Sequence, residues 1–323
     1  MRRAVLAALG VLLAVACARA APATAYDGLF APDSYRNRPL SASAPIDALS
    51  SLYVNDLASK VSRLGVWVNT TKFSTPVYTV PAGRPTTPVA AYDPDHPDDP
   101  DPNPALAAQW QAVPLPPGAQ PADGTDHHLA VYQPGNGGTL WEFWRFEPNG
   151  GHPRAQYGGR MDDVGANPGY FTDGYGATAS GIPLLVGLQR LGELRAGTID
   201  HAVNLVVNHA GVPFRWPAQR GDGSNPVPTA VQEGMRFRLP ASLNIAALHL
   251  PPYATMVARA VQRYGMVVTD TTGDEVGAAF DAEDPAPTGQ NPYLGPTGIF
   301  GAVAPDQDGQ FLDFPWTKLQ LLR

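Results

Sequence analysis

The chain has 323 residues, of which 44% are hydrophobic and 16% are charged, so it is long and apolar enough to bury a core. Its formal charge of −7 argues against nucleic acids and anionic membrane surfaces as partners. The 35 prolines and 33 glycines are typical of many short strands joined by turns and loops, which predicts a mainly β fold.

The first 20 residues have the pattern of a secretory signal peptide. Arg2 and Arg3 form a basic start, and an apolar stretch follows at 4–16. This stretch is shorter than a bilayer span requires, and Ala18-Arg19-Ala20 provides a cleavage site. We therefore expect residues 1–20 to be a signal peptide and the protein to be secreted.

Cys17 is the only cysteine of the chain, and it lies inside the predicted signal peptide. Cleavage after Ala20 leaves a mature chain, residues 21–323, with no thiol and no disulfide. Cysteine nucleophiles and cysteine-based zinc sites are therefore not expected. A lipoprotein anchored through Cys17 is the less favoured alternative, because alanine three residues before the cysteine fits a lipoprotein signal poorly. We expect no membrane partner for the mature chain.

The mature chain begins with an extended arm at 21–45 that is rich in alanine, proline and serine. The first helix is predicted at 46–64, where apolar residues recur at steps of three and four, and Gly65 suits its C-cap. Short strands are predicted next, at 66–68 and 76–80.

The segment 93–104, with the sequence DPDHPDDPDPNP, is rich in aspartate and proline. Proline disfavours helix and sheet, which predicts a solvated loop in a polyproline-like conformation. Calcium binding is the functional alternative, because carboxylates are hard oxygen ligands, but EF-hand spacing is absent. We expect an ordinary acidic loop and no metal or cofactor in the protein.

A hairpin is predicted at 125–147, TDHHLAVYQPGNGGTLWEFWRFE, and it is the most informative segment of the chain. Two strand-like runs flank a turn rich in glycine and asparagine, and strand side chains alternate between two faces. If Gln133 pairs with Thr139, the even-numbered residues of both strands share one face. That face carries Asp126, His128, Tyr132, Glu142, Trp144 and Phe146. Acid, imidazole and aromatic groups together favour a binding cleft over a core.

The remainder of the chain begins with a long loop at 148–176 that is rich in glycine, aspartate and tyrosine, a kind of loop that is commonly functional. Helices and short strands then follow. Helices are predicted at 183–196 and 252–264, and strands at 199–208, 214–217, 235–239 and 266–269. With no internal repeat and no linker, these elements predict a single domain at 21–323, mainly β, as a jelly roll or β-sandwich with a few packed α-helices.

Six motifs follow one another in a specific order between about Ser34 and Asp270. They are DHHLAVYQ, LWEFW, GATASGIPLLVGLQRLGELRAGTIDHAV, FRWPA, GMRFRLPAS and RAVQRYGMVVTD. Their order resembles that of a family of secreted hypothetical proteins from soil bacteria, although Trp141 stands where tyrosine is common. The family has no established activity, so the resemblance implies a shared fold and secretion but no mechanism.

The hairpin face also offers the groups that polysaccharide cleavage needs, because the reaction requires proton transfer at the bridging oxygen or at a ring carbon. Glu142 and Asp126 are the candidate acid, base or nucleophile, and His128 would orient them or carry protons. Trp144 and Tyr132 would bind substrate, since aromatic rings stack on sugars. Replacing Glu142 with glutamine is therefore expected to abolish turnover.

Four residues outside the hairpin are weaker candidates for substrate binding. Arg236 and Arg238 share one strand face and could hold a uronate or sulfate, or pair with acidic neighbours. Asp173 would supply a second carboxylate, and His201 would be either a base or a satisfied polar residue. A metal site at the hairpin is disfavoured, because adjacent histidines point to opposite faces of a strand.

The sequence therefore predicts a secreted carbohydrate-active enzyme that cleaves an extracellular polysaccharide, either a glycoside hydrolase or a polysaccharide lyase. Two alternatives remain open: a non-catalytic secreted glycan-binding or cell-surface protein, and a structural envelope protein without glycan contact. The sequence contains no G-x-S-x-G elbow, no H-E-x-x-H motif and no P-loop, which argues against those enzyme classes.

Overall fold

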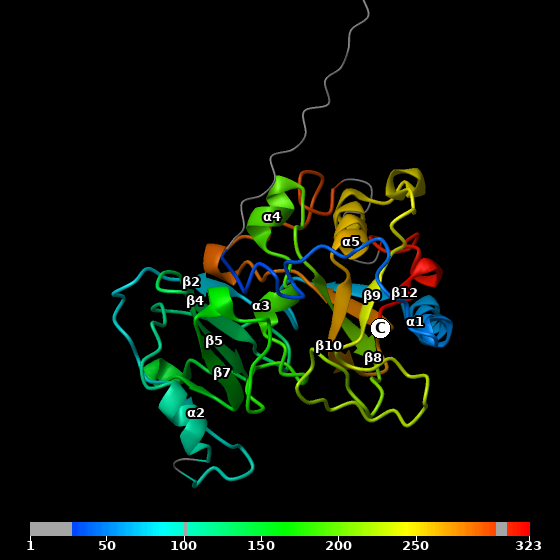
Figure 1. Cartoon of the computed structure of the whole chain (residues 1–323). Coiled ribbons are helices and arrows are strands. Elements are labelled where there is room, and N and C mark those ends of the chain that lie inside the picture. The colour runs from blue at the N-terminus through cyan, green and yellow to red at the C-terminus, as the bar shows by residue number, and fades with distance from the viewer. Residues whose placement is uncertain (1–27, 100–101, 302–308) are drawn as a thin grey trace, which may run out of the picture.

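The computed structural model describes residues 28–99, 102–301 and 309–323, and its two larger sheets lie beside each other (Figure 1). The predicted signal peptide, with Cys17, lies outside the described residues. Within the described part there are twelve strands and five α-helices, so the prediction of a mainly β fold is confirmed. None of the helices in this part has the length and apolar character needed to cross a bilayer.

The larger sheet has six strands in the order β1-β11-β8-β10-β9-β12. The strands are β1 (Val66–Asn69), β8 (Val203–Asn208), β9 (Arg236–Arg238), β10 (Met266–Thr272), β11 (Ala278–Asp281) and β12 (Gln320–Leu321). The pairs β1–β11 and β8–β10 are parallel, whereas the other three pairs are antiparallel. Because jelly rolls are antiparallel, this mixed pairing does not confirm the predicted jelly-roll or sandwich arrangement.

One face of the larger sheet packs against two helices and forms the main core. The helices are α1 (Ser50–Leu64) and α5 (Pro252–Arg263). Strand residues of this face alternate with residues of the opposite face, as the period of two requires. Helix α1 begins later than the predicted 46–64, because the side chain of Asp47 accepts the N–H of Leu49 (2.8 Å) in a turn before the helix.

The smaller sheet has four strands in the order β2-β4-β5-β7. They are β2 (Val77–Thr79), β4 (Leu129–Gln133), β5 (Thr139–Trp144) and β7 (Tyr157–Asp162). The hairpin β4–β5 has the predicted register, in which Gln133 pairs with Thr139. Both of its faces are buried, since Tyr132 and Leu140 lie in one apolar cluster and Val131 and Phe143 lie in another. Within β4 and β5, therefore, the even-numbered side chains pack in the core. Residues of this hairpin can line a cleft only at the ends of the two strands.

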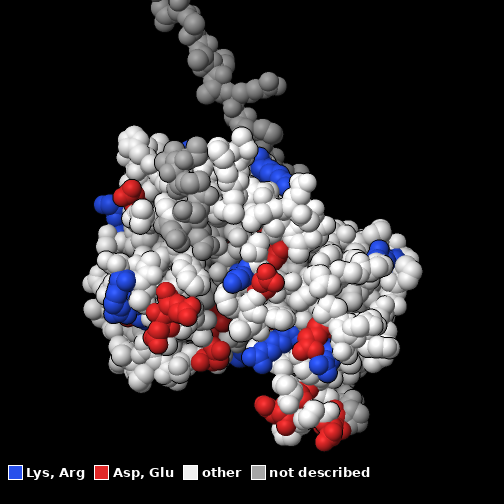
Figure 2. Space-filling view, turned by 180° about the vertical axis from the view of Figure 1, so that it is seen from behind, with Lys and Arg blue, Asp and Glu red and all other residues white. Residues whose placement is uncertain are grey.

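The acidic loop projects from the smaller sheet, and Figure 2 shows acidic side chains gathered on this projection. The two short strands β3 (Ala90–Ala91) and β6 (Arg154–Ala155) pair at its base. The loop ends at α2 (Pro104–Gln109), a helix that the sequence did not predict. Asn103 caps this helix by accepting the N–H of Leu106 (3.1 Å).

Three of the predicted elements are wrong. The loop predicted at 148–176 contains the strands β6 and β7. The helix predicted at 183–196 is two short helices, α3 (Leu184–Gly187) and α4 (Leu191–Ala196). The chain is extended between them because Gln189 pairs with the segment after β11, donating its N–H to the carbonyl of Asp281 (3.1 Å). The strand predicted at 214–217 is a loop that contains a cis peptide bond before Pro217.

Candidate functional site

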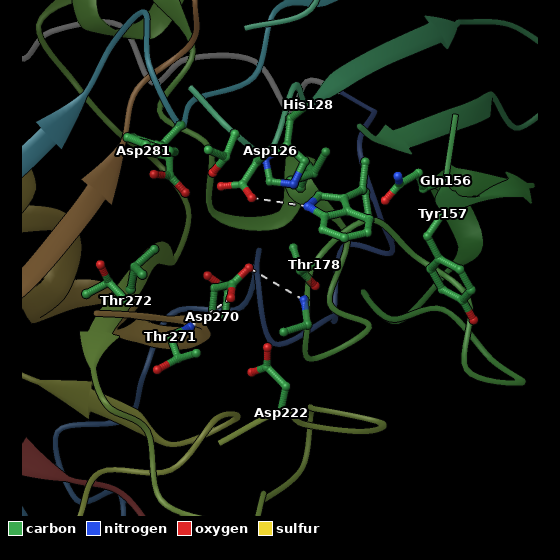
Figure 3. A pocket seen from close by; sticks show the side chains of 18 of the residues that line it. Asp126, His128, Gln156, Tyr157, Thr178, Asp222, Asp270, Thr271, Thr272 and Asp281 are labelled. Atoms are coloured by element: carbon green, nitrogen blue, oxygen red, sulfur yellow. Dashed lines mark hydrogen bonds between the residues drawn. The ribbon is translucent and has the colours of Figure 1, made fainter. Parts of the chain in front are cut away.

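A cavity of about 990 Å³ lies between the two larger sheets (Figure 3). Its walls come from the segment before β4, the end of β5, the start of β7, the loop that precedes α3, and the second face of the six-stranded sheet. Its acidic and aromatic lining residues include Trp67, Tyr92, Asp126, Trp144, Tyr157, Asp222, Asp270 and Asp281.

The floor of the cavity is a row of residues that crosses four strands of the larger sheet, and Asp270 of β10 ends this row. The row consists of Trp67, Ala279, Val206 and Asp270. Strict alternation would place Asp270 on the core face with Val268, which pairs with the buried Leu205. A register shift between Val268 and Asp270 pairs Asp270 with Val206 instead, and this bulge turns its carboxylate toward the cavity.

Asp281 closes β11 and points into the same space (Figure 3). Its carboxylate accepts hydrogen bonds from the side-chain amides of Asn69 (2.8 Å) and Asn204. Burial raises the pKa of Asp281 to about 7 against the effect of these donors, and the negative charge of Asp126 contributes to the rise. The carboxyl group therefore keeps its proton to a higher pH than an ordinary aspartic acid.

Asp126 and His128 stand just before β4 on the opposite side of the cavity (Figure 3). The indole N–H of Trp144, at the end of β5, donates to Asp126 Oδ1 (3.1 Å) and so orients this carboxylate. Burial lowers the pKa of His128 despite the nearby charge of Asp126, so the imidazole is neutral at pH 7. The hairpin thus contributes one carboxylate, one neutral imidazole and one indole to the cavity.

Arg220 is the one Lys or Arg among the described residues that line the cavity. Its guanidinium donates to the carbonyls of Gly174, Gly176, Thr178 (2.6 Å) and Ala179 (2.9 Å), and it stacks over the ring of Tyr157. Four carbonyl acceptors therefore hold this cation on the loop that walls the cavity, and its N–H groups are directed at backbone rather than at a carboxylate.

We expect Arg220→Met to lower the free energy of unfolding by about 2–4 kcal/mol, because charge-assisted hydrogen bonds to otherwise unpartnered carbonyls are lost. The loop at 174–179 should open locally in the variant. Hydrogen exchange of the 174–179 amides checks this, with Arg160→Met, an exposed arginine of β7, as the control. Unchanged exchange in Arg220→Met would show that the loop is held by other contacts.

Three of the sequence-predicted site residues, Asp126, His128 and Trp144, line the cavity, but Glu142 does not. Glu142 is fully buried in the middle of β5, and its Oε1 accepts the N–H of Leu185 (3.3 Å) at the start of α3. Burial raises its pKa to about 8. The carboxyl group thus holds the N-terminus of α3, and it is mainly protonated at neutral pH.

The predicted arginine pair lies away from the cavity and holds the N-terminal arm. Arg236 donates to the carbonyls of Tyr35 (2.7 Å) and Tyr264, and Arg238 donates to that of Ser41 (2.7 Å). Because these donors are used on backbone carbonyls, the pair does not form the predicted anion site.

The other three predicted substrate-binding residues also lie outside the cavity lining. Tyr132 packs in an apolar cluster, and Asp173 is exposed on its loop. His201 is buried, with its Nε2 3.0 Å from Glu193 Oε1. Packing explains the position of Tyr132, and the contact with Glu193 explains that of His201.

Sequence reasoning missed the acidic residues of the larger sheet and of its loops. Asp270 lies inside β10 and Asp281 lies at the end of β11, and neither is among the predicted site residues. A usable signal was present, since each follows an apolar run, MVVT or AAF, that predicts a buried strand. Asp222 and Glu233 lie in an irregular loop, where no periodic pattern identifies them.

No protein-family model, curated protein or solved structure matches this chain. The resemblance to secreted proteins of soil bacteria therefore stays a prediction. Any functional conclusion has to be argued from the cavity and its side chains.

Proposed function

We propose that the protein is a glycoside hydrolase that cleaves a polysaccharide in the cavity between the two sheets. The observation that carries the proposal is Asp281, whose pKa of about 7 suits a general acid, pointing into the same space as Asp126. Glycosidases commonly use two carboxyl groups whose surroundings give them different protonation states.

In this proposal Asp281 donates its proton to the bridging oxygen of the glycosidic bond. Asp126, oriented by the indole of Trp144, acts as the base that activates water or as the nucleophile. His128 lies beside Asp126 and, because its imidazole is neutral, adds no positive charge there. Trp144 and Tyr157 line the cavity as aromatic surfaces on which a sugar ring can stack.

Hydrolysis of neutral sugars is favoured over elimination from uronates by the charges around the cavity. A lyase needs a group that neutralises the carboxylate of the uronate. The cavity lining is rich in aspartate, and the guanidinium of Arg220 is held by backbone carbonyls. Without a bound cation, a negatively charged sugar would therefore be repelled from this cavity.

Secretion is part of the proposal and is supported by the signal-peptide pattern of residues 1–20. An extracellular polysaccharide would then be accessible to the enzyme. Non-catalytic glycan binding is the alternative function, since the same aromatic residues would serve it without proton transfer.

The test is incubation of the purified protein with a panel of neutral and uronate-containing polysaccharides. Reducing ends and the absorbance of unsaturated products are measured in parallel. We expect reducing ends from at least one neutral polysaccharide and no unsaturated product. An unsaturated product would instead identify a lyase, and glycan binding without any product would identify a binding protein.

A further inference from the structure

Three carboxylates converge on the wall of the cavity formed by β10 and by the loop between β8 and β9. They belong to Asp222, Glu233 and Asp270, and one oxygen atom from each lies within 4.8 Å of the others. Asp222 and Asp270 line the cavity on the side away from His128 (Figure 3), whereas Glu233 is fully buried. Three like charges this close repel one another unless protons or a cation neutralise them.

Glu233 provides a second and independent observation. Its Oε2 accepts the backbone N–H of Asp222 (3.1 Å), but its Oε1 is buried and has no hydrogen-bond partner among the described residues. Buried polar atoms without a partner are rare because their desolvation is uncompensated. A ligand that coordinates oxygen would supply the missing partner.

The described residues place no cation in an ion pair with the cluster. None of the ion pairs in the described part of the chain includes Asp222, Glu233 or Asp270. Arg220 is nearby in sequence, but its guanidinium is directed at backbone carbonyls. No ion pair of the described residues therefore neutralises the cluster, although the charge of Arg220 acts on Asp222 and Glu233.

We propose that Asp222, Glu233 and Asp270 bind one calcium ion at the wall of the cavity. The donors are all carboxylate oxygens, which calcium prefers. Ligands of one calcium ion at Ca–O distances of about 2.4 Å lie at most about 4.8 Å apart, and the three oxygen atoms satisfy this limit. Magnesium demands near-ideal octahedral geometry and gives up its bound water reluctantly, so calcium is the better fit to an all-carboxylate cluster.

The ion would be anchored by the buried Glu233 and would face the cavity between Asp222 and Asp270. Calcium takes six to eight oxygen ligands, so water or sugar hydroxyl groups would complete its coordination. The inference concerns binding alone and does not depend on hydrolysis. It can be tested without a glycan.

The experiment is a calcium titration of the EDTA-treated full chain by isothermal calorimetry, with thermal unfolding measured in parallel. We expect one calcium per chain, a Tm that rises with calcium concentration, and weaker binding of magnesium. Glu233→Gln should weaken calcium binding at least tenfold. Asp222→Asn changes an exposed residue and should also weaken calcium binding at least tenfold. This variant provides the test if Glu233→Gln fails to fold.

Asp98→Asn is the matched control, because it removes one exposed carboxylate from the acidic loop at 93–104. Calcium binding should be unchanged in this variant. The proposal is overturned if calcium causes neither heat nor a Tm shift, since the carboxylates must then share protons. It is also overturned if Asp98→Asn removes binding and Glu233→Gln does not, because calcium would then bind the acidic loop.

Discussion

Replacement of Asp281 by asparagine is expected to lower kcat for glycan hydrolysis by about 10²–10⁴-fold, the contribution of a well-placed general acid. KM should change little, because the amide keeps the size of the carboxyl group. The variant should also lose the decline in activity that the wild type shows as pH rises through about 7, where Asp281 gives up its proton. Initial rates of reducing-end release between pH 5 and 9 measure both effects.

A matched control separates this loss from a general effect of charge. Asp162→Asn removes an exposed carboxylate at the end of β7, whose partners among the described residues are Arg160 and Thr139. Its kcat should equal that of the wild type. If Asp281→Asn also keeps the wild-type kcat and pH profile, Asp281 is not the acid.

Glu142→Gln is expected to stabilise the protein at alkaline pH and to keep its turnover. Glutamine resembles the protonated glutamate that the buried site prefers, and Glu142 does not line the cavity. The result would differ from the loss of turnover that the sequence pattern predicts. Chemical unfolding of both proteins at pH 5, 7 and 9 measures the difference in stability.

The direction of this pH effect follows from the number of protons that the folded and the unfolded states of the wild-type protein bind. The pKa of Glu142 is raised from 4.5 in the unfolded chain to about 8 in the folded protein, so between these values the folded state binds more protons. Its stability then falls with rising pH, by at most about 4–5 kcal/mol from this group. Glutamine does not titrate, so its advantage should be small at pH 5 and largest above pH 8. An advantage independent of pH would show that Glu142 is ionised in the folded protein.

The hairpin was the part of the site that could be predicted from the sequence, because its pairing joins residues that lie close together in the chain. Alternation and the glycine-rich turn fix the pairing of Gln133 with Thr139, and they place Asp126, His128 and Trp144 correctly together. The same alternation also suggested that Glu142 faces a cleft. In the structure α3 covers that face, a contact between distant segments that periodicity does not reveal.

The wall of the cavity that the six-stranded sheet forms depends on contacts between distant segments, which local sequence patterns do not reveal. A register shift turns Asp270 away from the core, and it depends on the pairing of β10 with β8. The position of Asp281 depends on Asn69 and Asn204, which come from two other strands. The strands β1, β8, β9 and β10 were recognised, but β11 and β12 were not. The parallel pairs β1–β11 and β8–β10 join segments far apart in the chain, and local patterns do not reveal them.

The most direct test of the central claim is a crystal structure of Asp281→Asn with an oligosaccharide from a neutral polysaccharide that the panel identifies as a substrate. The account predicts that the glycan lies in the cavity between the sheets, with a ring against Trp144 or Tyr157. The scissile oxygen should be within hydrogen-bond reach of residue 281, with Asp126 at the same sugar ring. A glycan bound outside this cavity, or in it but away from both carboxyl positions, would contradict the proposed site.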